Sequence, residues 1–344
     1  MVRKRKAVRP VSEIGAGFQI LVCLINGLGD AFLALPVIRS LIQEFGGDNV
    51  IVWSPSDIFE TVFSGLSCGK ISLHFSREHA YPFLDETGDR ERALKSLQGS
   101  QKTVWISLNA YSPLWPIEIS VREVLQPLVA YGFGGRPEFF RNAMSASITP
   151  MRDQYFHVIG ETVRNDPEQR RPYLKQSALT KSRAYVDAQV SDGFRGIVMF
   201  HTDTEATKQW DIKNWLELAS LVRKELNLLP MALGRPSEKL LAGNLILSPP
   251  STWDLQVTHL ANATCFVGID SVFAHIADSL GIPGLTLFGQ SCQSEWGPKG
   301  PFLLALTAPT RELSQLKTGD VFAALCNNEL FTNNSHLNRS HFRL

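Results

Sequence analysis

Apolar and polar positions in the first part of the chain alternate between strand-like runs and helix-like spacing. Residues 18–25 (FQILVCLI) form a nearly continuous apolar run, as expected of a parallel strand buried on both faces. A glycine-rich turn follows at 26–30 (NGLGD), and apolar residues then recur at helical spacing until two glycines at 46–47 end the helix. Residues 49–53 (NVIVW) predict the next strand. The pattern therefore predicts a β–α–β unit of a parallel sheet.

The same kind of pattern predicts further strands and helices along the chain. In the first half we expect a strand at 103–108 and a helix near 86–98. A polar segment with two prolines, 164–172, indicates a domain boundary. Beyond it we expect one helix at 215–226, another at 272–280, and strands at 197–200, 229–233, 245–247, 265–267 and 285–289.

These elements predict an α/β fold with two Rossmann-like domains. We expect an N-terminal domain at 18–170 and a C-terminal domain at 171–326, facing each other across a cleft at the carboxyl ends of their strands. A basic, flexible arm at 1–17 precedes them, and a polar tail at 327–344 follows.

Composition narrows the function classes. The net charge of +1 argues against a protein that binds nucleic acid, which would carry a large basic excess. The apolar run at 18–25 is too short to span a bilayer, which takes about 20 residues. The five cysteines form no Cys-x-x-Cys pair, so neither a metal site nor a disulfide framework is predicted. We expect a cytoplasmic protein, with the basic start available for peripheral contact with the inner membrane.

One carboxylate in the first half is a candidate for proton transfer. Asp30 stands where a strand hands over to a helix, after the two glycines of the turn. It is either a helix N-cap or a carboxylate at the mouth of a cleft, placed to remove a proton from a hydroxyl. The turn is not a dinucleotide fingerprint, because the third glycine of Gly-x-Gly-x-x-Gly would fall at Phe32. No cofactor is predicted.

The second half offers polar groups suited to a phosphate or a sugar nucleotide. Asp270 and Ser271 stand at a predicted helix N-terminus, where partial positive charge and unpaired N–H groups suit anions. Thr204 and Lys208 follow the strand at 197–200, and a hydroxyl with an ammonium suits a diphosphate. Two further residues have open interpretations. Glu238 is a ribose ligand or a first-turn helix glutamate, and His275 is a ligand or a packing residue.

The chain resembles the bacterial ADP-heptose:lipopolysaccharide heptosyltransferases, glycosyltransferase family 9. The resemblance covers about residues 18–305 and rests on five blocks: 29–39 (GDAFLALPVIR), 208–210 (KQW), 268–277 (GIDSVFAHIA), 280–289 (LGIPGLTLFG) and 296–300 (WGPKG). It implies a GT-B fold and an inverting, metal-independent transfer of a heptosyl group from ADP-heptose to an acceptor hydroxyl, as in lipopolysaccharide biosynthesis.

The resemblance also implies roles for single residues. Asp30 would be the general base. The donor nucleotide would be bound by Thr204, Lys208, Glu238, Asp270, Ser271 and His275, with Gly29 and Val272 as phosphate-loop positions; Val272 replaces the family's glycine. The acceptor stays open among the lipopolysaccharide core, a protein and a secondary metabolite. A different nucleotide sugar, and a nucleotide-sugar-binding or epimerase-type GT-B protein, are the alternatives.

Overall fold

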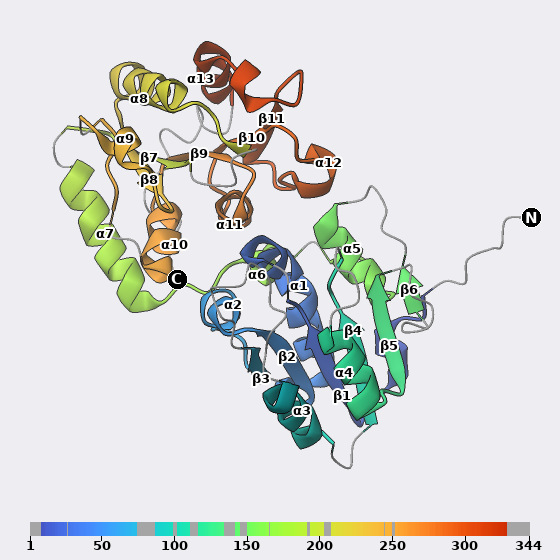
Figure 1. Cartoon of the computed structure of the whole chain (residues 1–344). Coiled ribbons are helices and arrows are strands. Elements are labelled where there is room, and N and C mark those ends of the chain that lie inside the picture. Colours follow the sequence, from blue (N-terminus) through green and yellow to red (C-terminus); the bar gives the residue numbers. More distant parts are fainter. Residues whose placement is uncertain are drawn as a thin grey trace, which may run out of the picture. The chain divides into compact units, whose positions relative to one another are not determined.

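The computed structural model divides the chain into two compact units, Met1–Tyr173 and Leu174–Leu344 (Figure 1). Each unit is an α/β domain with one parallel sheet. The residues that the structure describes are 8–25, 27–73, 87–98, 102–110, 116–133, 142–144, 150–164, 166–190, 193–202, 208–243, 245–249 and 252–328.

The first unit contains a six-stranded sheet in the order β3-β2-β1-β4-β5-β6, in which every neighbouring pair is parallel. This 3-2-1-4-5-6 order is that of a Rossmann fold. Its strands are β1 (Phe18–Cys23), β2 (Val50–Pro55), β3 (Gly69–Leu73), β4 (Lys102–Ser107), β5 (Val129–Phe133) and β6 (Asn142–Met144). Its helices are α1 (Leu28–Phe45), α2 (Ser56–Thr61), α3 (Thr87–Ser96), α4 (Pro116–Leu125), α5 (Met151–Val158) and α6 (Pro167–Arg170).

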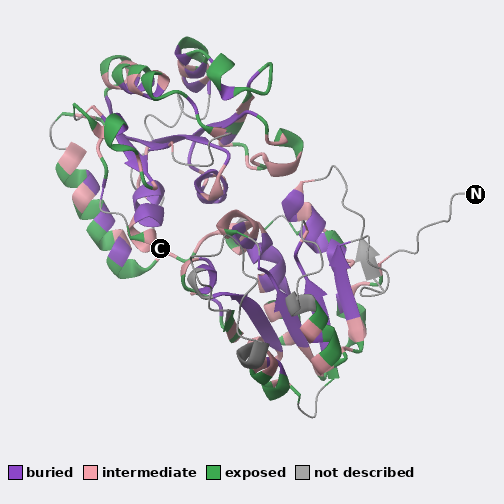
Figure 2. Cartoon of the chain, viewed as in Figure 1, coloured by how far each residue is buried: buried purple, intermediate pink, exposed green. Residues whose placement is uncertain are grey.

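The expected β–α–β unit is confirmed as β1, α1 and β2, and the reason is burial. Residues Ile20–Cys23 of the central strand are fully buried, and Figure 2 shows the sheet as the buried layer of the unit. Trp53 on β2 and Trp105 on β4 are also 0% exposed and belong to one apolar cluster with Leu21 and Cys23. A strand covered on both faces needs apolar side chains at every position, which is why its sequence does not alternate.

Part of the expected flexible arm is packed on the first unit. Residues Val11–Ile14 form the short 3-10 helix η1, and Val11 is 2% exposed. The Val11 N–H donates to the carbonyl of Ile159, and the Ser12 N–H donates to the Glu161 carboxylate at 3.0 Å. One buried apolar side chain and these two hydrogen bonds therefore attach residues 11–14 to the first unit. The basic residues at 3–6 lie outside the described residues.

The second unit contains a five-stranded parallel sheet in the order β8-β7-β9-β10-β11. This is the 2-1-3-4-5 order of the other common doubly wound fold. Its strands are β7 (Gly196–His201), β8 (Leu228–Leu233), β9 (Cys265–Ile269), β10 (Gly284–Phe288) and β11 (Leu303–Thr307). Its helices are α7 (Gln176–Val190), α8 (Ile212–Leu226), α9 (Glu238–Leu241), α10 (Trp253–Ala261), α11 (Val272–Leu280), α12 (Gln293–Trp296) and α13 (Thr318–Cys326).

The strand predicted at 245–247 is wrong. Leu247 forms only an isolated parallel bridge with Met231, beside β8. The apolar run Leu245–Leu247 nevertheless packs on the domain core, because Ile246 is 1% exposed. Burial of one side chain therefore explains the apolar pattern without a full strand.

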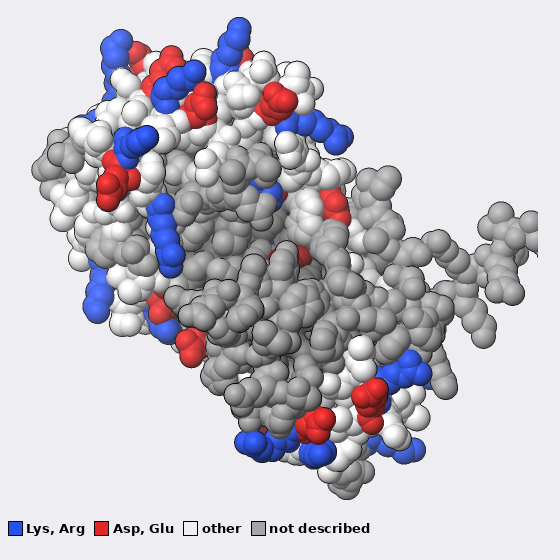
Figure 3. All heavy atoms as spheres, viewed as in Figure 1, with Lys and Arg blue, Asp and Glu red and all other residues white. Residues whose placement is uncertain are grey.

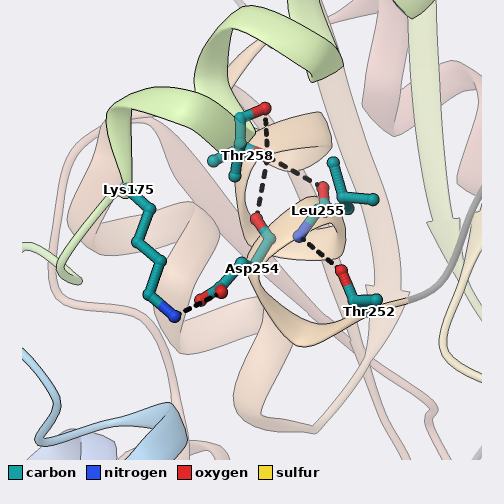
Figure 4. A network of polar contacts seen from close by, with 6 residues as sticks. Lys175, Thr252, Asp254, Leu255 and Thr258 are labelled. Atoms are coloured by element: carbon teal, nitrogen blue, oxygen red, sulfur yellow. Dashed lines mark hydrogen bonds and ion pairs between the residues drawn. The ribbon is translucent and has the colours of Figure 1, made fainter.

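Aromatic packing in the core and a polar contact between two helical regions contribute to the packing of the second unit. Trp210 and Trp215 are 3% and 1% exposed, with their rings at 83° and 5.0 Å between centroids. Figure 4 shows a contact between α10 and the residue just before α7, where Lys175 Nζ lies 2.6 Å from the Asp254 carboxylate. In the same view the Thr252 hydroxyl accepts the Leu255 N–H and so caps α10. Trp210 and Trp215 both belong to the apolar core of the second unit.

Surface charge and helix hydrophobicity are the two remaining features of the fold. Figure 3 shows basic and acidic side chains interspersed over the described surface of this face. None of the helices in the described part of the chain combines the length and the apolar character needed to cross a membrane.

Candidate active site

In the first sheet, Asp30 lies at the point where the strand order reverses. β1 and β4 are neighbours, and the connection from β1 leads to β2 on one side while the connection from β4 leads to β5 on the other. α1 follows β1 directly, and Asp30 is its third residue, half-buried in the first turn. Ligands of doubly wound sheets bind at such switch points. The fold therefore places Asp30 where a ligand of this domain is expected.

The N-cap interpretation of Asp30 is wrong. Gly27 is the N-cap of α1, with φ −69° and ψ 176°, and Asp30 stands three positions further on. A carboxylate in the first turn still benefits from the partial positive charge of the helix N-terminus. Apart from the adjoining residues and the backbone of α1 itself, no described atom lies within 4 Å of a Cβ built on Gly27 or on Gly29. Packing within the described protein therefore does not account for either glycine, and the space in front of Asp30 suits a close approach by a ligand.

Two residues distant in sequence from Asp30 form hydrogen bonds near the carboxyl end of β1. The Tyr155 hydroxyl of α5 donates to Oδ1 of Asp30 at 3.1 Å. Asn109, just beyond β4, accepts the Ile25 N–H at 2.9 Å and donates to the Ser107 hydroxyl at 3.1 Å. Asn109 thereby ties the end of β1 to the end of β4 at the switch point. Sequence patterns did not identify either residue as part of the site, because neither belongs to a motif and both act across long chain separations.

The second sheet has its own switch point between β7 and β9, and two predicted site residues meet there. Lys208 follows β7 and Asp270 follows β9. The Lys208 Nζ lies 3.1 Å from Asp270 Oδ2, and the two side chains are 30% and 7% exposed. The carboxylate is buried while the ammonium keeps partial access to solvent. A cation held in this way at a switch point is suited to an anionic group of a ligand.

The N-terminus of α11 lies directly beside this ion pair. Ser271 is the N-cap, yet its side chain makes no capping bond, and within the described residues its buried hydroxyl oxygen has no hydrogen-bond partner. Val272 begins the helix and is partly buried, and His275 is the fourth helical residue, 8% exposed. The first N–H groups of a helix are unpaired donors. The structure thus gathers Lys208, Asp270, Ser271 and His275 around one strand end.

A buried histidine that the sequence patterns did not single out completes this edge. His201 is the last residue of β7, 6% exposed, with its ring 4.8 Å from the Phe273 ring of α11. Burial lowers the pKa of His201 to about 4, so the imidazole is neutral at pH 7. Its Nδ1 has no hydrogen-bond partner among the described residues.

Two predicted donor ligands are not brought to the ion pair by described contacts. Glu238 is an exposed residue at the start of the four-residue helix α9, which follows β8 along the chain. Ser237 is the N-cap of this helix. Both of its interpretations stay open. Thr204 lies outside the described residues. Within the described part of the chain, no group of three His, Cys, Asp or Glu side chains is arranged to hold a metal ion.

The sequence profile of glycosyltransferase family 9 (heptosyltransferase) matches residues 139–325, which is more than half of the chain. The chain belongs to this family. A curated relative, lipopolysaccharide heptosyltransferase 1 of Escherichia coli O18:K1:H7 (strain RS218 / NMEC), is 27% identical over 131 residues. That alignment covers 36% of this chain and 40% of the relative, so less than half of the relative's length is matched.

Solved structures of the same family share the fold. A family 9 glycosyltransferase from Veillonella parvula DSM 2008 superposes with a TM-score of 0.68, covering 92% of this chain and 98% of the other at 14% identity. The E. coli heptosyltransferase WaaC with ADP gives a TM-score of 0.66, covering 90% and 100% at 17% identity. The α/β fold is therefore GT-B, with two parallel α/β domains in sequence, as predicted.

Proposed function

We propose that this protein is an inverting, metal-independent glycosyltransferase that moves a heptosyl group from ADP-heptose to an acceptor hydroxyl. The proposal rests on its membership of the heptosyltransferase family. The observation that supports it most directly is the placement of a carboxylate, Asp30, and a cation, Lys208, each at the switch point of its own sheet. These are the two charges that such a transfer needs.

In the proposed reaction the acceptor hydroxyl attacks the anomeric carbon from the face opposite the nucleotide. The new C–O bond forms as the bond to the diphosphate breaks. The hydroxyl proton passes to Asp30, acting as general base. A single displacement inverts the anomeric configuration and needs no covalent intermediate on the protein.

The leaving diphosphate gathers negative charge, and donors fixed in advance stabilise it best. Lys208 supplies a full charge held in place by Asp270. The first N–H groups of α11 and the Ser271 hydroxyl, which has no hydrogen-bond partner among the described residues, supply further donors. We assign Thr204, Glu238 and His275 to the same donor nucleotide, and Gly29 and Val272 to backbone positions that a ligand approaches closely.

The test is product analysis by mass spectrometry. The purified full chain is incubated with ADP-heptose and, separately, a lipopolysaccharide core acceptor, a protein acceptor and small hydroxylated metabolites. The expected result is one acceptor heavier by a heptosyl group, with ADP released. Tight binding of ADP-heptose without release of ADP in any mixture would contradict the proposal and indicate a nucleotide-sugar-binding protein. An altered but untransferred sugar would indicate an epimerase.

Two variants, one at Asp30 and one at a control aspartate, test whether Asp30 is the general base. Asp30→Ala should lower turnover by about a hundredfold or more while leaving the melting temperature and ADP affinity nearly unchanged. Asp48→Ala, at an exposed aspartate beyond the same helix, is the matched control and should keep native turnover. Full turnover of Asp30→Ala combined with earlier melting would reduce Asp30 to a helix-stabilising residue.

A further inference from the structure

The phenol of Tyr155 is fixed in the first domain with its hydroxyl on the proposed general base. Tyr155 is 0% exposed and donates to Asp30 Oδ1 at 3.1 Å across 125 positions of sequence. Its ring packs edge-on against Phe133 at the end of β5, with 6.0 Å between centroids and 81° between planes. The neighbours Gln154 and Phe156 on α5 are 0% and 1% exposed. Burial and the contact with Phe133 thus hold the ring of Tyr155 in place.

A hydrogen bond from a neutral hydroxyl to a carboxylate has two consequences. It stabilises the ionised form, because the protonated acid is a weaker acceptor. It also fixes the plane of the carboxyl group, so the lone pairs stay aimed in one direction. A general base must be ionised and must point at the proton that it removes, within about 2.6–3.2 Å. Both requirements are ones that a buried phenol can serve.

We propose that Tyr155 is a positioning residue for the transfer reaction, acting through its hydrogen bond to Oδ1 of Asp30. The inference rests on the proposed role of Asp30 as general base. Tyr155 keeps its own proton throughout, and the proton of the acceptor hydroxyl goes to the Asp30 carboxylate. Tyr155 touches neither donor nor acceptor in this account, and it sets the orientation and the ionisation of the group that does.

Other ionisable groups lie on the elements packed against α1, and they stay unchanged in the test. On α5 these are Arg152 and Asp153, whose Nε and Oδ1 atoms are 3.4 Å apart, and the exposed His157. The remaining ones are Glu168 and Arg170 on α6, Arg171 beyond it, and Asp48 in the 3-10 helix Gly47–Asn49. A variant that removes only one hydroxyl leaves all of these charges in place, so a change in the pH profile reports on the loss of the Tyr155 hydroxyl.

The test is Tyr155→Phe, which keeps the ring and its packing against Phe133. We expect kcat to fall about tenfold, the scale of one lost hydrogen bond to a charged group, with KM and ADP affinity unchanged. We also expect the acid limb of the pH–rate profile to move up by about one pH unit, because the carboxylate ionises less readily without its donor.

Tyr131→Phe is the matched control. Tyr131 on β5 is also 0% exposed, and within the described residues its hydroxyl has no hydrogen-bond partner. This variant removes a buried phenolic oxygen from the same domain without breaking a described bond, so kcat and the pH profile should stay native. An equal loss in both variants would show that only packing is affected, and would overturn the inference.

A double variant separates this inference from the proposed function. In an Asp30→Ala background, Tyr155→Phe should cause no further loss of kcat, because the bond is already gone. Independent, multiplying losses would overturn the inference and leave the proposed function intact. The inference would also be overturned, and the proposed function left intact, if Tyr155→Phe kept a native kcat and pH profile while Asp30→Ala was inactive. If Asp30→Ala itself keeps full turnover, the proposed base fails, and the inference fails with it.

Discussion

The Nζ atom of Lys208 and the Oδ2 atom of Asp270 lie 3.1 Å apart, although 62 positions of sequence separate the two residues. Asp270 is the buried partner and Lys208 is the partly exposed one. The buried carboxylate therefore holds the ammonium group in position, while the ammonium group itself stays accessible to solvent. An ammonium has three N–H donors, and one bond to Asp270 leaves capacity for a phosphate. The ion pair therefore keeps the Lys208 ammonium group in a fixed position at the end of the strand.

Lys208→Ala should weaken binding of ADP by about 1–3 kcal/mol, the scale of a charge-assisted hydrogen bond. Adenosine, which has no phosphate, should bind as it does to the native protein. Calorimetric titration with both ligands makes the comparison. Lys213→Ala is the control, because Lys213 is 79% exposed and pairs with Asp211 at 3.4 Å in the same domain. An equal loss for ADP and adenosine would mean that Lys208 does not contact phosphate.

Transferase activity should survive excess EDTA. The sequence contains no Asp-x-Asp motif of the kind that holds a divalent cation. Charge on the departing diphosphate would then be met by Lys208 and the N-terminus of α11, of which only Lys208 supplies a full unit charge. Rates are compared with chelator and with added magnesium. Loss of activity with chelator and recovery with metal would establish a metal-dependent transfer instead.

Stability should fall in acid partly because of His201. Its pKa is lowered to about 4 by burial, against 6.5 for an exposed histidine. Below pH 6.5 the unfolded chain takes up a proton that the folded chain refuses, so the free energy of unfolding falls as the pH drops from 6.5 to 4. Between pH 7.5 and 4.5 the native protein should lose about 2.5 kcal/mol more than His201→Leu.

Urea unfolding at the two pH values measures this difference directly. His157→Leu, at an exposed histidine of α5, is the control and should lose as much stability as the native chain. A loss in His201→Leu equal to that of the native protein would show that His201 takes up its proton as readily in the folded state as in the unfolded state.

Gly284→Ala should destabilise the second domain by about 3 kcal/mol or more. Gly284 begins β10 with φ at +152°, and a Cβ there would collide with the carbonyl oxygen of Phe266 and lie 2.8 Å from its carbon. Gly319→Ala on α13 is the control, because nothing lies within 4 Å of its Cβ and alanine favours a helix. Thermal unfolding should show a lowered midpoint for the first variant and an unchanged or raised one for the second.

Local sequence patterns predicted the centres of both sheets. Strands β1, β7 and β9 are fully or almost fully buried, and continuous apolar runs predict such strands well. They missed four strands, of which β3, β6 and β11 lie at sheet edges and β5 lies between β4 and β6. They did predict the edge strand β8, and they predicted a strand at 245–247 where one bridge forms. An edge strand has one neighbour instead of two, so pairing demands less of its side chains. The candidate site residues Asp30, Lys208 and Asp270 could be selected for a related reason, because each follows a strand that the sequence pattern predicts.

What the sequence by itself determined was therefore local: which segments are buried strands, which turns precede helices, and which polar residues stand at strand ends. Only the tertiary structure decided which of these residues meet. Tyr155 reaches Asp30 across 125 positions, and Asp270 reaches Lys208 across 62. Neither pairing leaves a periodic signal, because strand order and helix packing bring the partners together, and those depend on the burial of many side chains at once rather than on any spacing along the chain.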